Sequence, residues 1–172
     1  MRLYRGKIPV ISDEVTQLLI NDGCIEVDPA NVAEVSLDVK SVLDEYARVD
    51  YEILEKAKDI VSTRRMDYGQ LTRVREGLAR ERHFGINDEA YEWIIRQMIE
   101  VLMYSKNVEE IYAEDSELRR RIRDVLRKHT NLDDELDRQV KARIKNLQEG
   151  TTDFEIEYQR VLGDLRQQKR LT

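Results

Sequence analysis

Residues 28–63 read DPANVAEVSLDVKSVLDEYARVDYEILEKAKDIVST, and this stretch indicates the fold class more clearly than any other. Asp28 is a typical helix N-cap, and Pro29 suits the first helical position, where its missing N–H costs nothing. Apolar residues then recur at intervals of three and four as far as Thr63. The stretch predicts either one long amphipathic helix or two consecutive helices, the second of them capped by Asp50.

Further helical patterns lie on both sides of this stretch. Residues 1–11 lack a helical period and predict an extended lead-in, after which Ser12 resembles an N-cap. A stripe of apolar residues covers residues 68–82. Asn87 resembles the cap of a long apolar helix over residues 90–112. The remaining apolar stripes cover residues 118–126, 132–147 and 154–165.

The composition favours the same fold class. The chain of 172 residues contains only 7 Gly and 2 Pro, and it is 41% hydrophobic and 37% charged. Few helix breakers among so many good helix formers predict an all-α protein of helical bundles with short connections. No stretch approaches the length of a membrane span, and no apolar run typical of a signal peptide follows Met1. We therefore expect a cytoplasmic protein that does not enter a membrane.

The two halves of the chain share a pattern of apolar and acidic residues. An offset of 83 positions aligns Glu34–Val61 with Glu117–Ile144. An offset of 75 positions aligns Ile11–Glu14 with Ile86–Glu89. The difference of eight residues predicts that the first helix of the second half is longer by about two turns.

This pattern predicts an internal duplication. If the halves are related, Val42 and Val125 occupy equivalent positions, and both are buried. The predicted organisation is two homologous helical repeats, residues 1–82 and residues 83–172.

Short motifs at both ends and in the middle of the chain resemble a known family. They are Met1-Arg2-Leu3 with Lys7-Ile8, Val42-Leu43 followed by Val49–Ile53, and Glu149-Gly150-Thr151 followed by Asp153–Tyr158. The chain resembles an uncharacterised bacterial family, the five-hundred-and-seventh in the series of domains of unknown function. The resemblance implies a bacterial, helical, duplicated protein, and it assigns no catalytic or binding residue.

Residues that could support catalysis at neutral pH are few. His83 and His129 are the two histidines, and neither has the Glu three residues earlier that a di-iron helical bundle requires. We expect His129 to lie where a helix ends, a place where histidines commonly bond terminal carbonyls. The sequence contains no phosphate-binding glycine loop, no H-E-x-x-H motif and no G-x-S-x-G motif. These observations predict a non-catalytic protein without a metal or cofactor.

The net charge of −6 is unevenly distributed along the chain. Residues 13–59 carry a net charge of −9, and residues 63–82 contain six arginines against three acids. Residues 119–128 contain six basic residues and a single acid, Asp124. Such a helix could lie along nucleic-acid phosphates, or its cations could pair with Asp124, Glu117 or the acidic first half. The candidate residues are Arg119, Arg120, Arg121, Arg123, Arg127 and Lys128.

The helix predicted over residues 90–112 has few polar positions through its middle. Two interpretations remain open: a central core helix surrounded by both halves, or a helix with one face left for a partner. The residues of this core or interaction face are Trp93, Ile94, Met98, Val101 and Leu102.

We therefore expect a structural or interaction protein that binds a protein partner, or a second copy of itself, through apolar helix faces. The alternative function is association with nucleic acid, RNA in particular, through the helix of residues 119–128.

Overall fold

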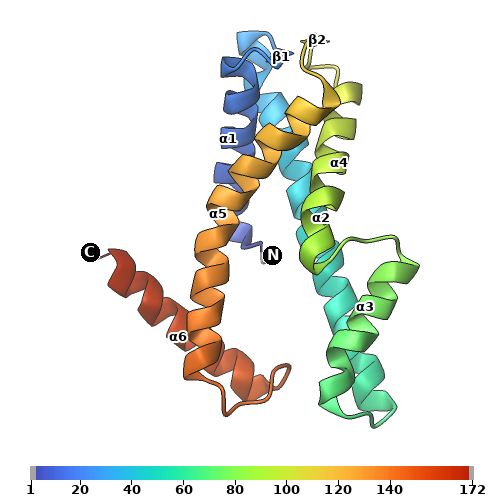
Figure 1. Ribbon diagram of the computed structural model, residues 1–172, viewed down its shortest axis with the longest axis vertical. Helices are drawn as coiled ribbons and strands as arrows, with labels where there is room; N and C mark the ends of the chain where they lie inside the picture. The colour runs from blue at the N-terminus through green and yellow to red at the C-terminus, as the bar shows by residue number, and fades with distance from the viewer. Residues whose placement is uncertain (1–2, 171–172) are drawn as a thin grey trace.

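The computed structural model describes residues 3–170, with residues 131–134, 169 and 170 described by their backbone alone. The described chain is almost entirely helical (Figure 1), which confirms the predicted all-α class. In these residues no helix is long and apolar enough to cross a membrane. The elements are α1 (Ile8–Asn21), β1 (Ile25–Glu26), α2 (Val32–Thr63), α3 (Leu71–Glu81), α4 (Ala90–Tyr104), β2 (Glu110–Ile111), α5 (Asp115–Arg143) and α6 (Thr152–Arg170).

Four of the helices form a bundle. Helix α1 packs against α2, α2 against α4, α4 against α5, and α5 against α1, so the contacts close into a ring. Strands β1 and β2 pair antiparallel at one end of this bundle, with Ile25 opposite Ile111 (Figure 1). The pairing joins the loop that follows α1 to the loop that follows α4.

Differences in helix length produce two arms at the other end of the bundle. Helix α2 has 32 residues and is about 48 Å long, whereas α1 has 14 residues and is about 21 Å long. The apolar face of α2 beyond α1 needs a different cover, and α3 supplies it. Helix α5 likewise extends beyond the bundle and is covered by α6. The α2–α3 arm and the α5–α6 arm diverge from the bundle (Figure 1).

The long stretch that indicated the fold class forms one continuous helix. The Asp28 carboxylate accepts a hydrogen bond from the Ala30 amide at 2.8 Å, and Pro29 begins the short 3-10 turn that leads into α2. The proposed division at Asp50 is wrong, because Asp50 lies within α2 and pairs with Arg75 at 2.5 Å. Helix α5 is also continuous, so the expectation that a helix ends at His129 is wrong as well.

The predicted start of the first helix is wrong. The 3-10 turn Arg5–Lys7 and α1 occupy most of the segment expected to be extended, and Met1 and Arg2 lie outside the described residues. Pro9 lies in the first turn of α1, where proline is tolerated. The Ser12 hydroxyl is buried and donates to the Ile8 carbonyl at 2.8 Å, so Ser12 is an internal residue rather than a cap.

Helix α4 begins at Ala90 as expected but ends at Tyr104 instead of Tyr112. The Ser105 hydroxyl donates to the Asp38 carboxylate at 2.5 Å and accepts from the Asn107 amide at 3.2 Å. Side-chain bonds of this kind compete with helix continuation, and the chain then turns to pair with β1. The predicted cap at Asn87 is also wrong, since Asn87 has a φ of 54° inside a 3-10 turn.

Both halves of the described chain contain a helix, a short strand, a long helix and a further helix, in that order. Helix α1 ends at Asn21 and α4 at Tyr104, which are 83 positions apart. Because α1 has 14 residues and α4 has 15, the expected two extra turns are absent. Val42 and Val125 are both buried, as expected. The same offset aligns Leu132 with Val49, but the Leu132 side chain lies outside the described side chains. Homology between the halves remains a prediction.

Candidate functional site

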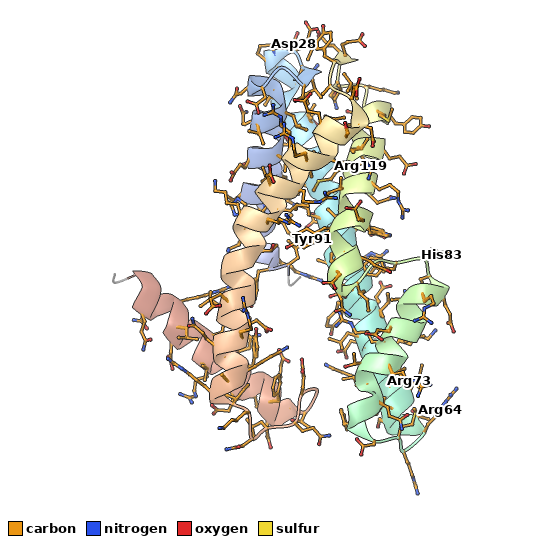
Figure 2. All side chains as sticks on the ribbon, in the orientation of Figure 1. Asp28, Arg64, Arg73, His83, Tyr91 and Arg119 are labelled. Atoms are coloured by element: carbon orange, nitrogen blue, oxygen red, sulfur yellow. The ribbon has the colours of Figure 1, made fainter. Side chains whose placement is uncertain are left out.

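In the basic segment of α5, three arginines form ion pairs with acidic side chains of the same chain. Arg119 pairs with Asp115 at 2.5 Å and with Glu92 of α4 at 3.6 Å. Figure 2 labels Arg119 where α5 lies beside α4. Arg123 pairs with the same Glu92. Arg121 pairs with Glu117 at 3.0 Å and with Asp22, which follows α1.

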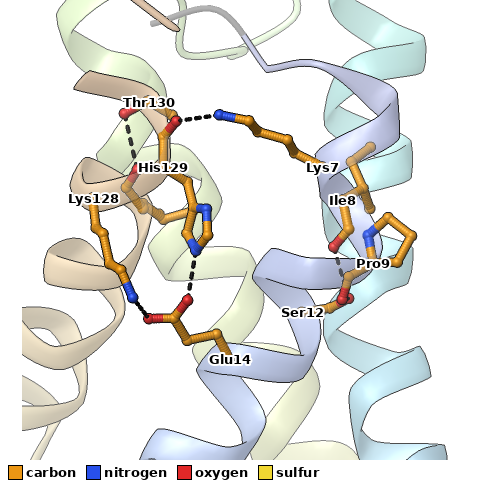
Figure 3. A network of polar contacts seen from close by, with 9 residues as sticks. Lys7, Ile8, Pro9, Ser12, Glu14, Lys128, His129 and Thr130 are labelled. Atoms are coloured by element: carbon orange, nitrogen blue, oxygen red, sulfur yellow. Dashed lines mark hydrogen bonds and ion pairs between the residues drawn. The ribbon is translucent and has the colours of Figure 1, made fainter. Parts of the chain in front are cut away.

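A second group of polar contacts joins α5 to α1 (Figure 3). The Glu14 carboxylate binds the Lys128 ammonium at 2.6 Å and the His129 Nε2 atom at 2.6 Å. These hydrogen bonds, that of Lys128 first and that of His129 second, hold the pKa of Glu14 below its ordinary value. The Lys7 ammonium also donates to the His129 carbonyl at 3.2 Å. The network fastens the N-terminal segment to the middle of α5.

Four of the six predicted nucleic-acid-binding residues are therefore engaged with acidic residues of the same chain. Arg120 and Arg127 are exposed, and neither forms an ion pair with any side chain that the structure describes. Arg121 and Lys128 pair with Asp22 and Glu14 of the first half, as the alternative interpretation expects. Arg119 and Arg123 pair instead with Glu92, which lies in the second half. Nucleic-acid binding by this helix remains a prediction.

The apolar helix α4 contributes both to the core and to the surface. Ile94, Met98 and Leu102 are buried, whereas Trp93 and Val101 are partly buried. The Trp93 ring packs edge-on against Phe84 with centroids 4.9 Å apart, and against Tyr46 at 5.6 Å. Met103 is 68% exposed and Tyr104 is 82% exposed, so α4 is not surrounded on all sides in the described chain.

The two arms enclose a cavity of about 1030 Å³. Its apolar lining comes from both arms: Tyr46, Tyr51 and Leu54 from α2, Leu71 from α3, and Phe154 from α6. Tyr51 is 58% exposed, so its ring is available inside a concave surface. Helices that are far apart in the sequence, α2 and α3 on one side and α5 and α6 on the other, therefore line the same cavity.

Most of the charged residues in the cavity wall form ion pairs within one arm. In the α2–α3 arm, Arg75 binds Asp50 at 2.5 Å. In the α5–α6 arm, Lys141 binds Asp137 and Glu149, each at 3.2 Å. Burial alone would lower the pKa of Lys141, but the two carboxylates raise that pKa above its ordinary value. These pairs leave the wall close to neutral.

A glycine brings the arms into contact at their far ends. Gly150 has a φ of +93°, a left-handed conformation that other residues rarely adopt. A Cβ atom at this position would lie 3.1 Å from both Tyr68 Cε1 and Leu71 Cδ2 of the other arm. A glycine therefore allows the loop before α6 to approach α3 closely. This loop lines the cavity together with Tyr68 and Leu71.

The N-terminal segment packs on the α5–α6 arm. The Tyr4 and Tyr158 hydroxyls lie 3.3 Å apart, and the Arg166 guanidinium stacks over the Tyr4 ring at 4.6 Å. The Tyr158 hydroxyl also donates to Asp137 at 2.6 Å. Leu3 and Arg5 of the same segment line the cavity. The first residues of the chain thus help to position one of its walls.

Sequence patterns did not reveal this cavity, because its lining residues look like ordinary amphipathic helix positions. Tyr51, an aromatic residue opposite the buried stripe of α2, was the one sequence feature that could have indicated the cavity.

The single Cys24 is buried. Burial, and after it the nearby Glu117 carboxylate, raise the pKa of its thiol. Among the described residues, no group of three or more His, Cys, Asp or Glu side chains is arranged to hold a metal ion.

Comparisons with known proteins agree with the motifs at the two ends of the chain. A comparison with curated proteins gives no match. A family model described as "Protein of unknown function (DUF507)" matches residues 1–171. The match covers the bundle and both arms, and it leaves the biochemical role open. With nearly the whole chain matched, the protein belongs to the DUF507 family.

Proposed function

We propose that this protein is a non-catalytic interaction protein of the cytoplasm, and that its two arms hold a polypeptide segment of a partner protein between them. The observation that carries the proposal is the cavity of about 1030 Å³ with Tyr51 exposed in its wall. Its volume lies at the upper end of the range for small-molecule pockets, which favours a larger occupant.

The chemistry of the wall supports a polypeptide as this occupant. Tyr51 and the partly buried Leu54 provide apolar contact area of the kind that anchors aliphatic and aromatic side chains. The ion pairs Arg75–Asp50 and Lys141–Asp137 neutralise the nearby charges, so the wall offers little to attract a polyanion. An amphipathic segment with a few apolar anchors matches such a surface.

Site-specific photo-crosslinking tests the proposal. A benzophenone amino acid replaces Tyr51 in one variant and Tyr104 in a control variant, because Tyr104 is more exposed and lies on α4, outside the cavity lining. We expect a discrete protein adduct in the source cells from position 51 and none from position 104. The captured partner, once purified, should bind the Tyr51→Asp variant at least about tenfold more weakly than the wild type, a loss of about 1.4 kcal/mol.

The matched control for the binding step is Leu37→Asp. Leu37 is an exposed apolar residue of the same helix α2, 54% exposed and outside the cavity lining. This variant should bind the partner as the wild type does. Equal losses in both variants, or equal crosslinking at positions 51 and 104, would contradict the proposal. If the adduct contains a second copy of the chain, the cavity holds a segment of that copy, and the proposal of a different partner protein is wrong.

A further inference from the structure

The α2–α3 arm carries four exposed arginines that have no acidic partner among the described side chains. Arg64 and Arg65 follow the end of α2, and Arg73 and Arg80 lie on α3. We call these four residues the arm arginines. None of them forms an ion pair with a side chain that the structure describes. The basic residues of α5 are the reverse case, because most of them are paired.

Packing explains why the arm arginines remain unpaired. Among the described elements α3 packs against α2, whereas α5 packs against α1, α4 and α6 and so meets acids such as Glu14 and Glu92. Arg75 of α3 is paired with Asp50 of α2, and Arg82, which follows α3, is paired with Glu52 of α2. Arginines on the outer side of the arm have no neighbouring helix to provide an acid.

The arm arginines form an extended surface rather than a single point. Arg73 and Arg80 are seven residues apart in one helix, so they share a face and are separated by about 10 Å along its axis. Arg64 and Arg73 both lie towards the free end of the arm (Figure 2). A ligand that contacts all of them must carry several negative charges along its length.

Acidic residues near this surface do not cancel its charge. Residues 63–82 contain six arginines and three acids, but Arg75 and Arg82 are paired with Asp50 and Glu52 of α2, so the four arm arginines face three acids, a net charge of +1. Of these acids, Asp67 accepts the Gly69 amide at 2.6 Å, and Glu76 accepts a long bond from the Asn87 amide group at 3.5 Å. The third acid, Glu81, lies at the last position of α3. The surface therefore keeps a small excess of positive charge, which the four exposed arginines carry.

We propose that the arm arginines bind the phosphate backbone of a nucleic acid. All four cations are arginines, and the planar guanidinium matches phosphate oxygens with two parallel hydrogen bonds. The large exposed apolar residues of the described chain lie outside residues 58–82, so this surface has no anchor to insert into a lipid bilayer. Tyr68 is partly buried, and binding without base stacking should be insensitive to sequence.

Fluorescence anisotropy with a labelled single-stranded RNA and a labelled DNA duplex of unrelated sequence tests the proposal. The test variant replaces the arm arginines, Arg64→Gln, Arg65→Gln, Arg73→Gln and Arg80→Gln together. Glutamine removes the charge and keeps a good helix propensity, and far-UV circular dichroism checks the fold. Titrations between about 50 and 200 mM salt measure the number of phosphate contacts from the slope of log K against log salt.

The wild type should bind at low salt, and the test variant should bind at least about tenfold more weakly, with a slope smaller by about three. A control variant, Arg120→Gln with Arg127→Gln, removes two exposed arginines of α5 that form no ion pair with the described side chains. It should bind as the wild type does. A larger effect of this control than of the test variant would overturn the assignment to the arm.

Three further results would also overturn the proposal. The first is no binding of either nucleic acid by the wild type at low salt. The second is equal binding to polyglutamate, which would reveal simple ion exchange. The third is tighter, arginine-dependent binding to vesicles of anionic phospholipid than to RNA or DNA. Each result is independent of the Tyr51 crosslinking experiment, so the two proposals fail separately.

Discussion

The two arms are built from the same kind of helical hairpin, yet their cores differ. In the α2–α3 arm, Leu71 and Leu78 belong to the apolar core that continues into the four-helix bundle. In the α5–α6 arm, Phe154, Tyr158 and Leu162 belong to a separate core formed with the second half of α5. One arm is an extension of the bundle, and the other is a small apolar unit attached to it.

An aromatic cluster causes this difference. Phe84, in the loop after α3, stacks on Tyr46 of α2 at 4.9 Å and packs against Trp93 of α4. A Cβ at Gly85 would lie 2.5 Å from the Glu89 carbonyl oxygen, so this loop follows the start of α4 closely. Helix α6 has no following helix to join it to the bundle in the described chain. We therefore expect the α5–α6 arm to open at a lower free energy than the α2–α3 arm.

The largest expected effect is that of Trp93→Ala. Trp93 joins α4 to α2 and to the loop after α3, so its loss should weaken the bundle and the α2–α3 arm together. We expect the free energy of unfolding to fall by about 3 kcal/mol in one cooperative transition, measured by chemical denaturation. The control Tyr104→Ala, an exposed aromatic of the same helix, should change it by less than about 0.5 kcal/mol. If the α2–α3 arm alone unfolds, this arm is not an extension of the bundle, and the proposed difference between the two arms is wrong.

Tyr158→Leu should have an intermediate and local effect. The variant loses the ring contact with Phe154 and the hydroxyl bond to Asp137, which together are worth about 2 kcal/mol. Hydrogen exchange of α6 should accelerate, while the amides of α1 and α4 keep the wild-type rates. Ile156→Ala, a change at an exposed position of α6, is the control. Faster exchange in all helices would show that the arm is not a separate unit.

Glu14→Gln should have the smallest effect. The pKa of Glu14 is lowered in the folded protein, so its contribution is complete above the ordinary carboxyl pKa and is lost as pH falls through the folded value. Because Glu14 is partly exposed, we expect at most about 1 kcal/mol near neutral pH. The difference between variant and wild type should vanish in acid. Glu100→Gln, at an exposed residue of α4, is the control substitution.

Local sequence signals predicted the helices well where packing and pattern agreed. The cap at Asp28 and the end of α2 at Thr63 follow from the stretch at residues 28–63. The boundaries failed where a tertiary contact competed with the local pattern. Ser12 resembled a cap, but burial against the bundle favoured an earlier start at Ile8. Tyr112 continued an apolar run, but pairing of β2 with β1 ended the helix eight residues earlier.

The sequence by itself determined that the chain is helical and which face of each helix is apolar, because both depend on a period of 3.6 residues within one segment. The tertiary structure alone decided which charges remain free. Lys128 meets Glu14 from 114 positions away, so the most basic segment is largely neutralised, while Arg73 and Arg80 on the peripheral α3 are not. It also decided that a cavity exists, since the angle between two arms depends on how four helices pack and not on the pattern of any one of them.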